Sequence, residues 1–185
     1  MIEIMIGITI FAMLILVGLP SFTQWMQSAQ IRTMTETMLA GVQLARAEAV
    51  RRNSLVRFQM VSTMDATCAL STSGTHWIVS LDDPTGLCNV ANSETTTPRI
   101  LQSRASSEGT LNAAVAASQS TLVFNGLGRV TPVPSANVTF DITNPTGGTC
   151  ASASGKMRCL RVVVSPGGQV RMCDPAVAST DPQGC

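Results

Sequence analysis

Six cysteines are the residues with the clearest chemistry, and their spacing favours disulfide bonds over a metal site. There is no Cys-x-x-Cys pair and only one histidine, so a zinc site is poorly supported. Proximity along the chain favours three pairs, each of which would stabilise the fold by ~3 kcal/mol if unstrained. Reduced, buried thiols are the alternative. The expected pairs are Cys68–Cys88, Cys150–Cys159 and Cys173–Cys185.

Residues of the kinds found in active sites occur singly or in turn-like contexts. His76 stands beside Trp77 in a predicted strand, where a structural role is expected. Asp82 and Asp83 precede a proline and a glycine, which is typical of a turn; two adjacent carboxylates alone are weak support for a cation site. The segment GLGRV lacks the lysine and hydroxyl residue of a phosphate-binding loop. The sequence therefore predicts a protein that is not an enzyme, with no cofactor and no metal.

Glu3 is a carboxylate at the head of a long apolar run, and the next ionisable residue is Arg32. A carboxylate in an apolar medium costs several kcal/mol unless it is protonated or paired. A cation supplied by another molecule would be a suitable partner for Glu3. The alternative is a glutamate near a membrane surface that reaches water.

The apolar run itself, Ile4 to Leu19, is a little shorter than the ~20 residues of a membrane-spanning helix. Phe22, Trp25 and Met26 would lengthen it, with Trp25 near an interface. A cleaved signal peptide would carry basic residues before the run and a small-x-small site after it, and neither is present. A plain membrane anchor leaves Glu3 unexplained.

Beyond Pro20 the apolar pattern changes to one face of a helix. The spacings of three and four residues, and the pair Glu48 and Arg52 at i and i+4, predict continued helix. We expect one helix from about Ile2 to Arg52, kinked near Pro20 because proline removes a helical hydrogen bond. The apolar positions are Ile31, Met34, Met38, Val42, Ala45 and Ala49.

Short alternating segments after Asn53 predict strands separated by loops rich in Gly, Ser, Thr, Asn and Pro. The segment Ala105–Ser120 is small and polar, and is expected to be a loop or a weak helix. The resulting fold class is α+β: a long N-terminal helix, kinked near Pro20, whose apolar face covers one antiparallel sheet. The predicted strands are LVRFQMV, HWIVSL, TLVFN, NVTFDI, CLRVVVS and GQVRMC.

An apolar helix headed by glutamate, the later Pro20 and the amphipathic LARAEAVRRN resemble the type IV pilin superfamily. The stretch QLARAEAVRRNSLVRF is similar to the minor pilins and pseudopilins of the FimT/FimU and GspH group. Two later stretches also match the family, LVFNGLGRV and RVVVSPGGQVRMCDP. The middle of the chain, residues 62–120, resembles the family only in its general character.

The resemblance implies a division into an apolar transmembrane or assembly helix, residues 1–28, and a pilin-like head, residues 29–185. In the family the acid at the position of Glu3 attracts the N-terminal amine of a neighbouring subunit, and that terminus is methylated after a basic leader is removed. The sequence would then begin at an internal methionine, and an in-frame leader upstream would show this; a departure from the family without processing is the alternative.

The function implied is a minor pilin that initiates or caps a type IV pilus, with a minor pseudopilin of a type II protein secretion system as the alternative. The expected partners are other pilin or pseudopilin subunits, the inner membrane and its assembly platform. The expected location is the inner membrane with a periplasmic head, and then the filament, at its tip.

DNA binding during natural transformation is a further alternative, because some relatives use a Gly-Arg-x-Arg motif in the last strand. The matching stretch here is GGQVR, in which Gln169 replaces the first arginine while Arg171 remains. Arg158, Arg161 and Arg171 would form at most a small basic patch, and the net charge is only +1. Nucleic acid is therefore the less favoured partner.

Overall fold

The computed structural model describes residues 2–105 and 112–185, without the side chains of residues 12 and 16–21. One long helix, α1 (Ile2–Arg52), precedes eight described strands. The strands and 3-10 helices are β1 (Val56–Val61), β2 (His76–Ser80), β3 (Ile100–Arg104), β4 (Ala114–Ala117), β5 (Thr121–Phe124), β6 (Val138–Thr143), η1 (Pro145–Gly147), η2 (Ala151–Ala153), β7 (Leu160–Val164) and β8 (Val170–Cys173).

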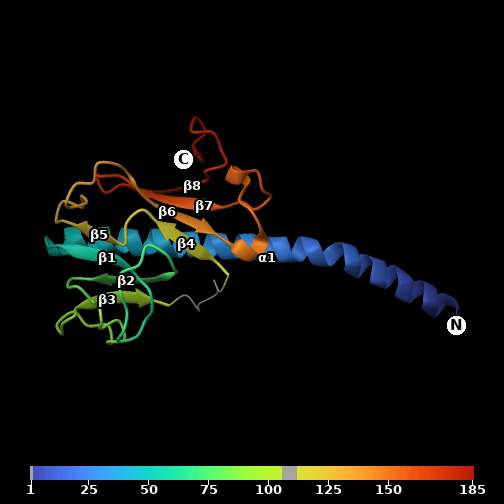
Figure 1. The fold of residues 1–185 in the computed structure, drawn as a ribbon, viewed down its shortest axis with the longest axis horizontal. Helices are drawn as coiled ribbons and strands as arrows, with labels where there is room; N and C mark the ends of the chain where they lie inside the picture. The colour runs from blue at the N-terminus through green and yellow to red at the C-terminus, as the bar shows by residue number, and fades with distance from the viewer. Residues whose placement is uncertain (1, 106–111) are drawn as a thin grey trace.

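The strands form two antiparallel sheets rather than the single sheet expected from the sequence. One sheet has the order β3-β2-β1-β5 and the other β4-β6-β7-β8. The C-terminal half of α1 contacts both sheets, and its N-terminal half extends beyond the head (Figure 1). The α+β class is confirmed, but the helix covers two sheets because its buried stripe faces strands on either side.

The predicted apolar face of α1 is buried in the main core. Its six expected residues are all at most 2% exposed, and they pack with the inward side chains of both sheets. Phe58 of β1 joins the sheets, since its ring lies 5.8 Å from that of Phe140 and 5.6 Å from that of Trp77 between centroids. Side chains alternate along a strand, so each sheet presents one face to this core.

A second, smaller core lies on the other face of the first sheet. Val61, Ile78 and Ile100 point away from α1 and pack against the Cys68–Cys88 disulfide. The other disulfides join Cys150 to Cys159 and Cys173 to Cys185. These are the three pairs that proximity along the chain favoured. The Cys68–Cys88 disulfide joins the β1–β2 connection to the β2–β3 connection.

Two strands lie where none was predicted. β3 contains the polar residues Gln102, Ser103 and Arg104, and β4 consists of Ala114–Ala117 within the segment expected to be a loop or helix. Each is the last strand in the order of its sheet, and β4 also forms an isolated antiparallel bridge between Ala116 and Ser73. Residues 106–111 of that segment lie outside the described residues.

Gly41 allows the helix to approach the aromatic core. A Cβ at this position would lie 2.9 Å from Trp77 Cη2 and 3.0 Å from Phe58 Cε2. We expect Gly41→Leu to lower the free energy of unfolding by about 2–3 kcal/mol or more, because the rings cannot move without disturbing the core. Urea unfolding of the full chain in detergent would measure this. Ala40→Leu, at the adjacent exposed position, is the matched control and should change little; equal effects of the two variants would contradict the packing argument.

Candidate assembly surface

The N-terminal half of α1 exposes a continuous apolar surface. Ten described apolar residues between Ile2 and Ile15 are 42–75% exposed, and Phe22 and Trp25 continue the surface at 57% and 67%. Thr9 adds little polarity because its hydroxyl donates to the carbonyl oxygens of Met5 and Ile6 at 3.0 and 2.8 Å. An apolar surface of this extent marks an interaction site.

Glu3 lies exposed in the first turn of α1. Among the described residues no cation lies within ion-pair distance of its carboxylate. An acid surrounded by apolar side chains needs a partner from outside once that surface is covered. The intermolecular contact of Glu3 that the sequence predicts stays a prediction.

The helix is continuous through position 20, whose side chain is outside the described residues. The N-terminal half curves away from the axis of the half inside the head (Figure 1). The assignment of this bend to Pro20 stays a prediction.

Within the part of the chain that the structure describes, no helix is both long and apolar enough to cross a membrane.

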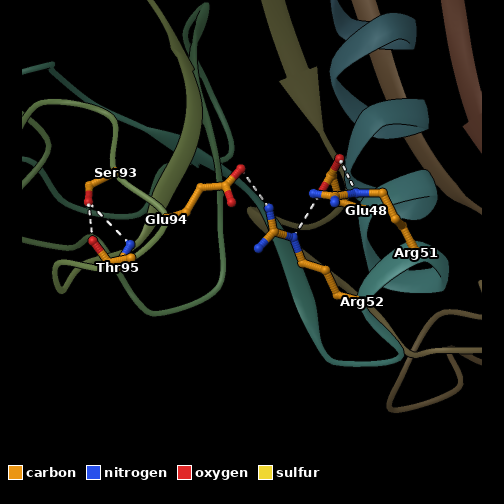
Figure 2. Close-up of polar contacts among 6 residues, drawn as sticks. All are labelled: Glu48, Arg51, Arg52, Ser93, Glu94 and Thr95. Carbon is orange, nitrogen blue, oxygen red and sulfur yellow. Dashed lines mark hydrogen bonds and ion pairs between the residues drawn. The ribbon is translucent and has the colours of Figure 1, made fainter.

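A charged network fastens the other end of α1 to the loop before β3. Glu48 accepts hydrogen bonds from Arg51 Nη2 and Arg52 Nε, both at 2.7 Å, as the i,i+4 spacing predicted for Arg52. Arg52 Nη2 also lies 2.9 Å from Glu94 Oε1 (Figure 2). The hydrogen bonds from Arg51 and then Arg52 lower the pKa of Glu48, so its carboxylate stays charged and the network holds at neutral pH.

The sequence profile of the family described as type II transport protein GspH matches residues 34–168. The chain belongs to the GspH family. Two crystal forms of the type IV minor pilin FimU from Pseudomonas aeruginosa have a similar fold, each with a TM-score of 0.53 and 16% identity. The similarity covers 83% and 87% of this chain and 98% of the FimU chain. No curated protein showed significant sequence similarity.

Membership of the GspH family confirms the predicted relationship to the FimT/FimU and GspH group of the type IV pilin superfamily. Proteins of this family are structural subunits rather than enzymes, and they act by association with other pilin or pseudopilin subunits. The exposed apolar half of α1 is the part of the chain suited to that association.

The three arginines predicted as a DNA-binding patch all bind acceptors within this GspH-family head. Arg158 Nε lies 2.7 Å from Asp174 Oδ2, and Arg161 Nε lies 2.6 Å from Asp141 Oδ1. Arg171 donates to the carbonyl oxygen of Gly184 and to a main-chain oxygen of Cys185, at 3.1 and 3.3 Å. Arg158 and Arg171 thereby hold the C-terminal disulfide loop. Two of the three charges are balanced by carboxylates, which reduces the attraction for phosphates, and DNA binding stays a prediction.

Asp82 and Asp83, the aspartates assigned to a turn, both accept hydrogen bonds from other residues of the GspH-family head. Asp83 Oδ1 accepts hydrogen bonds from Thr85 N and Oγ1 at 3.1 and 2.6 Å. Asp82 binds the Arg99 side chain through both carboxylate oxygens, at 2.9 and 2.7 Å.

His76, at the start of β2, is half-buried, and this burial lowers its pKa. Among described residues no group of three His, Cys, Asp or Glu side chains could hold a metal.

The Asp82–Arg99 pair predicts a loss of stability in acid. Hydrogen bonds from Arg99 lower the pKa of Asp82 to about 2, from an ordinary value of about 3.9. The stabilisation is therefore fully present above pH ~4 and is lost as pH falls towards ~2. Because the Arg99 side chain is 41% exposed and the pair is screened by solvent, we expect it to contribute only a small part of the free energy of unfolding.

Urea unfolding midpoints measured between pH ~2 and ~6 would test this linkage. Asp82→Asn and Arg99→Gln should each flatten the same part of the profile, and the double variant should add little. Profiles that stay parallel to the parent in all three variants would show that the pair contributes nothing.

Proposed function

We propose that this protein is a minor pilin that initiates or caps a type IV pilus. The main support is the combination of a disulfide-bonded head with a helix half whose large described side chains are apolar and exposed. Such a helix is suited to pack among other helices in a filament, while the head remains outside. The similarity to FimU, which is a type IV minor pilin, supports the same function.

Before assembly, residues 1–28 would hold the subunit at the inner membrane with the head in the periplasm. Three disulfides with no free cysteine suit an oxidising compartment outside the cytoplasm. The assembly platform of that membrane would then transfer the subunit to the filament, where we place it at the tip. Fractionation that found the newly made chain only among cytosolic proteins would contradict this route.

The family description, type II transport protein, favours a second function: a minor pseudopilin that acts in protein export. A deletion strain separates the two functions. Loss of surface pili with normal export would support the minor pilin, and loss of export with normal pili would support the pseudopilin. A strain normal in both respects would contradict both proposals. Re-expression of the full chain must restore the lost property.

A further inference from the structure

The base of the head, where the exposed half of α1 enters it, combines aromatic and basic side chains. Trp25 is 67% exposed, and its ring lies 6.0 Å from that of Phe22 between centroids. Two cavities of about 690 and 270 Å³ both include Trp25 and Ser28 in their lining. Arg32 and Arg158 line the larger cavity, and Lys156 lines the smaller one.

The two basic residues from the C-terminal part of the chain are placed by the buried residue between them. Met157 is 4% exposed, and its Sδ accepts a hydrogen bond from Ser28 Oγ at 3.9 Å. Lys156 and Arg158, on either side of Met157, are both exposed. The Cys150–Cys159 disulfide and a hydrogen bond from Gln27 Nε2 to the Thr146 carbonyl, at 3.2 Å, hold the surrounding loop against α1.

The charges at this base are unequally balanced. Arg158 pairs with the buried Asp174, and Arg32 pairs with Glu36 at the surface. Lys156 is the only lysine of the chain, and no carboxylate among the described residues pairs with it. The base therefore carries one uncompensated positive charge next to an exposed tryptophan and at the end of an apolar helix surface.

We propose that the base of the head binds the headgroups of anionic phospholipids before the subunit joins a filament. The phosphate would be contacted by the Lys156 ammonium and by the exposed guanidinium groups of Arg32 and Arg158. Trp25 and Phe22 would lie at the boundary between headgroups and acyl chains, where aromatic side chains accumulate. Basic residues beside an apolar membrane segment favour anionic lipids.

A lipid surface fits these residues better than an acidic protein partner does. The cations line two cavities that share Trp25, directly after the apolar surface that begins at Ile2. Lipids can fill both cavities at once, because each headgroup is small and mobile. A carboxylate of a second copy is the competing partner, and the experiment separates the two.

The single lysine provides the measurement. The full chain is reconstituted in vesicles of phosphatidylcholine, alone or with about a third phosphatidylglycerol, and treated with a water-soluble amine reagent. Peptide mapping then reports modification of Lys156 separately from the N-terminal amine. We expect modification to be roughly fivefold slower in the anionic vesicles, and the difference to shrink in high salt.

Two variants test the assignment to the base. Arg32→Gln and Trp25→Ala should each reduce the protection of Lys156, whereas Arg129→Gln should not. Arg129 is exposed in the loop after β5, next to the residue that packs against Arg46 and Val50 at the far end of α1. Arg158 is left unchanged because its loss would also leave Asp174 buried without its partner.

Equal modification in both vesicle types would overturn the proposal. So would protection that depends on the protein-to-lipid ratio but not on phosphatidylglycerol, since this would indicate a second copy. The headgroup contact requires that the chain associates with a membrane, as proposed above. A chain that floats with neither vesicle would refute that location as well, whereas a chain that floats with both and shows no lipid-dependent protection refutes only the headgroup contact.

Discussion

Glu3→Gln is expected to reduce incorporation of the subunit into filaments by roughly a hundredfold. The variant keeps the size and most of the polarity of the side chain but removes its charge. Removing one partner of a buried ion pair costs about 3–5 kcal/mol, and every ~1.4 kcal/mol is tenfold in an equilibrium. The large effect arises because the apolar surface of α1 around Glu3 excludes water once neighbouring helices cover it.

The incorporated fraction can be measured by immunoblotting of sheared filaments against the total cellular amount. Glu36→Gln is the matched control, since Glu36 lies on the same helix, is 52% exposed and pairs with Arg32 at the surface. It should assemble normally. Comparable losses for the two variants, or normal assembly of Glu3→Gln, would exclude a specific ion-pairing role for Glu3.

Arg158→Gln is expected to lower the free energy of unfolding of the head by about 2–4 kcal/mol. The partner of Arg158, Asp174, has a side chain only 5% exposed, so removal of the guanidinium leaves a nearly buried carboxylate with one backbone donor, Ala176 N at 2.9 Å. The exposed position of Arg158 itself, at 61%, lets water replace part of the contact and keeps the expected cost below the upper limit for buried pairs.

Arg161→Gln provides the comparison for this effect. Its partner, Asp141, is 36% exposed, so the carboxylate regains water and the expected cost is at most about 1 kcal/mol. Urea unfolding of both full-length variants in detergent would measure the difference. Similar values for the two would show that burial of Asp174 does not determine the effect. The same measurement decides whether a DNA-binding assay on Arg158→Gln can be interpreted without a folding defect.

The helix could be predicted almost to the residue because its signals are local. The repeated spacing from Ile31 to Ala49 marks the buried face, and Asn53 follows the last helical residue with the positive φ of 47° that suits a helix end. Strands β1, β2 and β5–β8 were likewise indicated by alternation of apolar and polar residues. Cysteine pairing followed from short separations of 9, 12 and 20 residues.

What could not be predicted depends on contacts between distant segments. Three of the four residues of β4 are alanine, which carries little strand signal, and pairing with β6 defines the segment as a strand. The division into two sheets likewise depends on strand pairings between segments that are distant in the sequence. The pairing of Arg158 with Asp174 joins residues on either side of two strands, so the sequence alone suggested a free cation where the structure has a neutralised one.

The arrangement of α1 also has a mechanical consequence. The N-terminal half of α1 is exposed and apolar, and the C-terminal half of the same continuous helix packs against both sheets of the head. A pull on the N-terminal end therefore acts parallel to the buried face, and all rows of packed side chains from Ile31 to Ala49 must slide together before the helix is extracted. The head should resist tension along the helix axis far better than a force that peels one sheet away from the other.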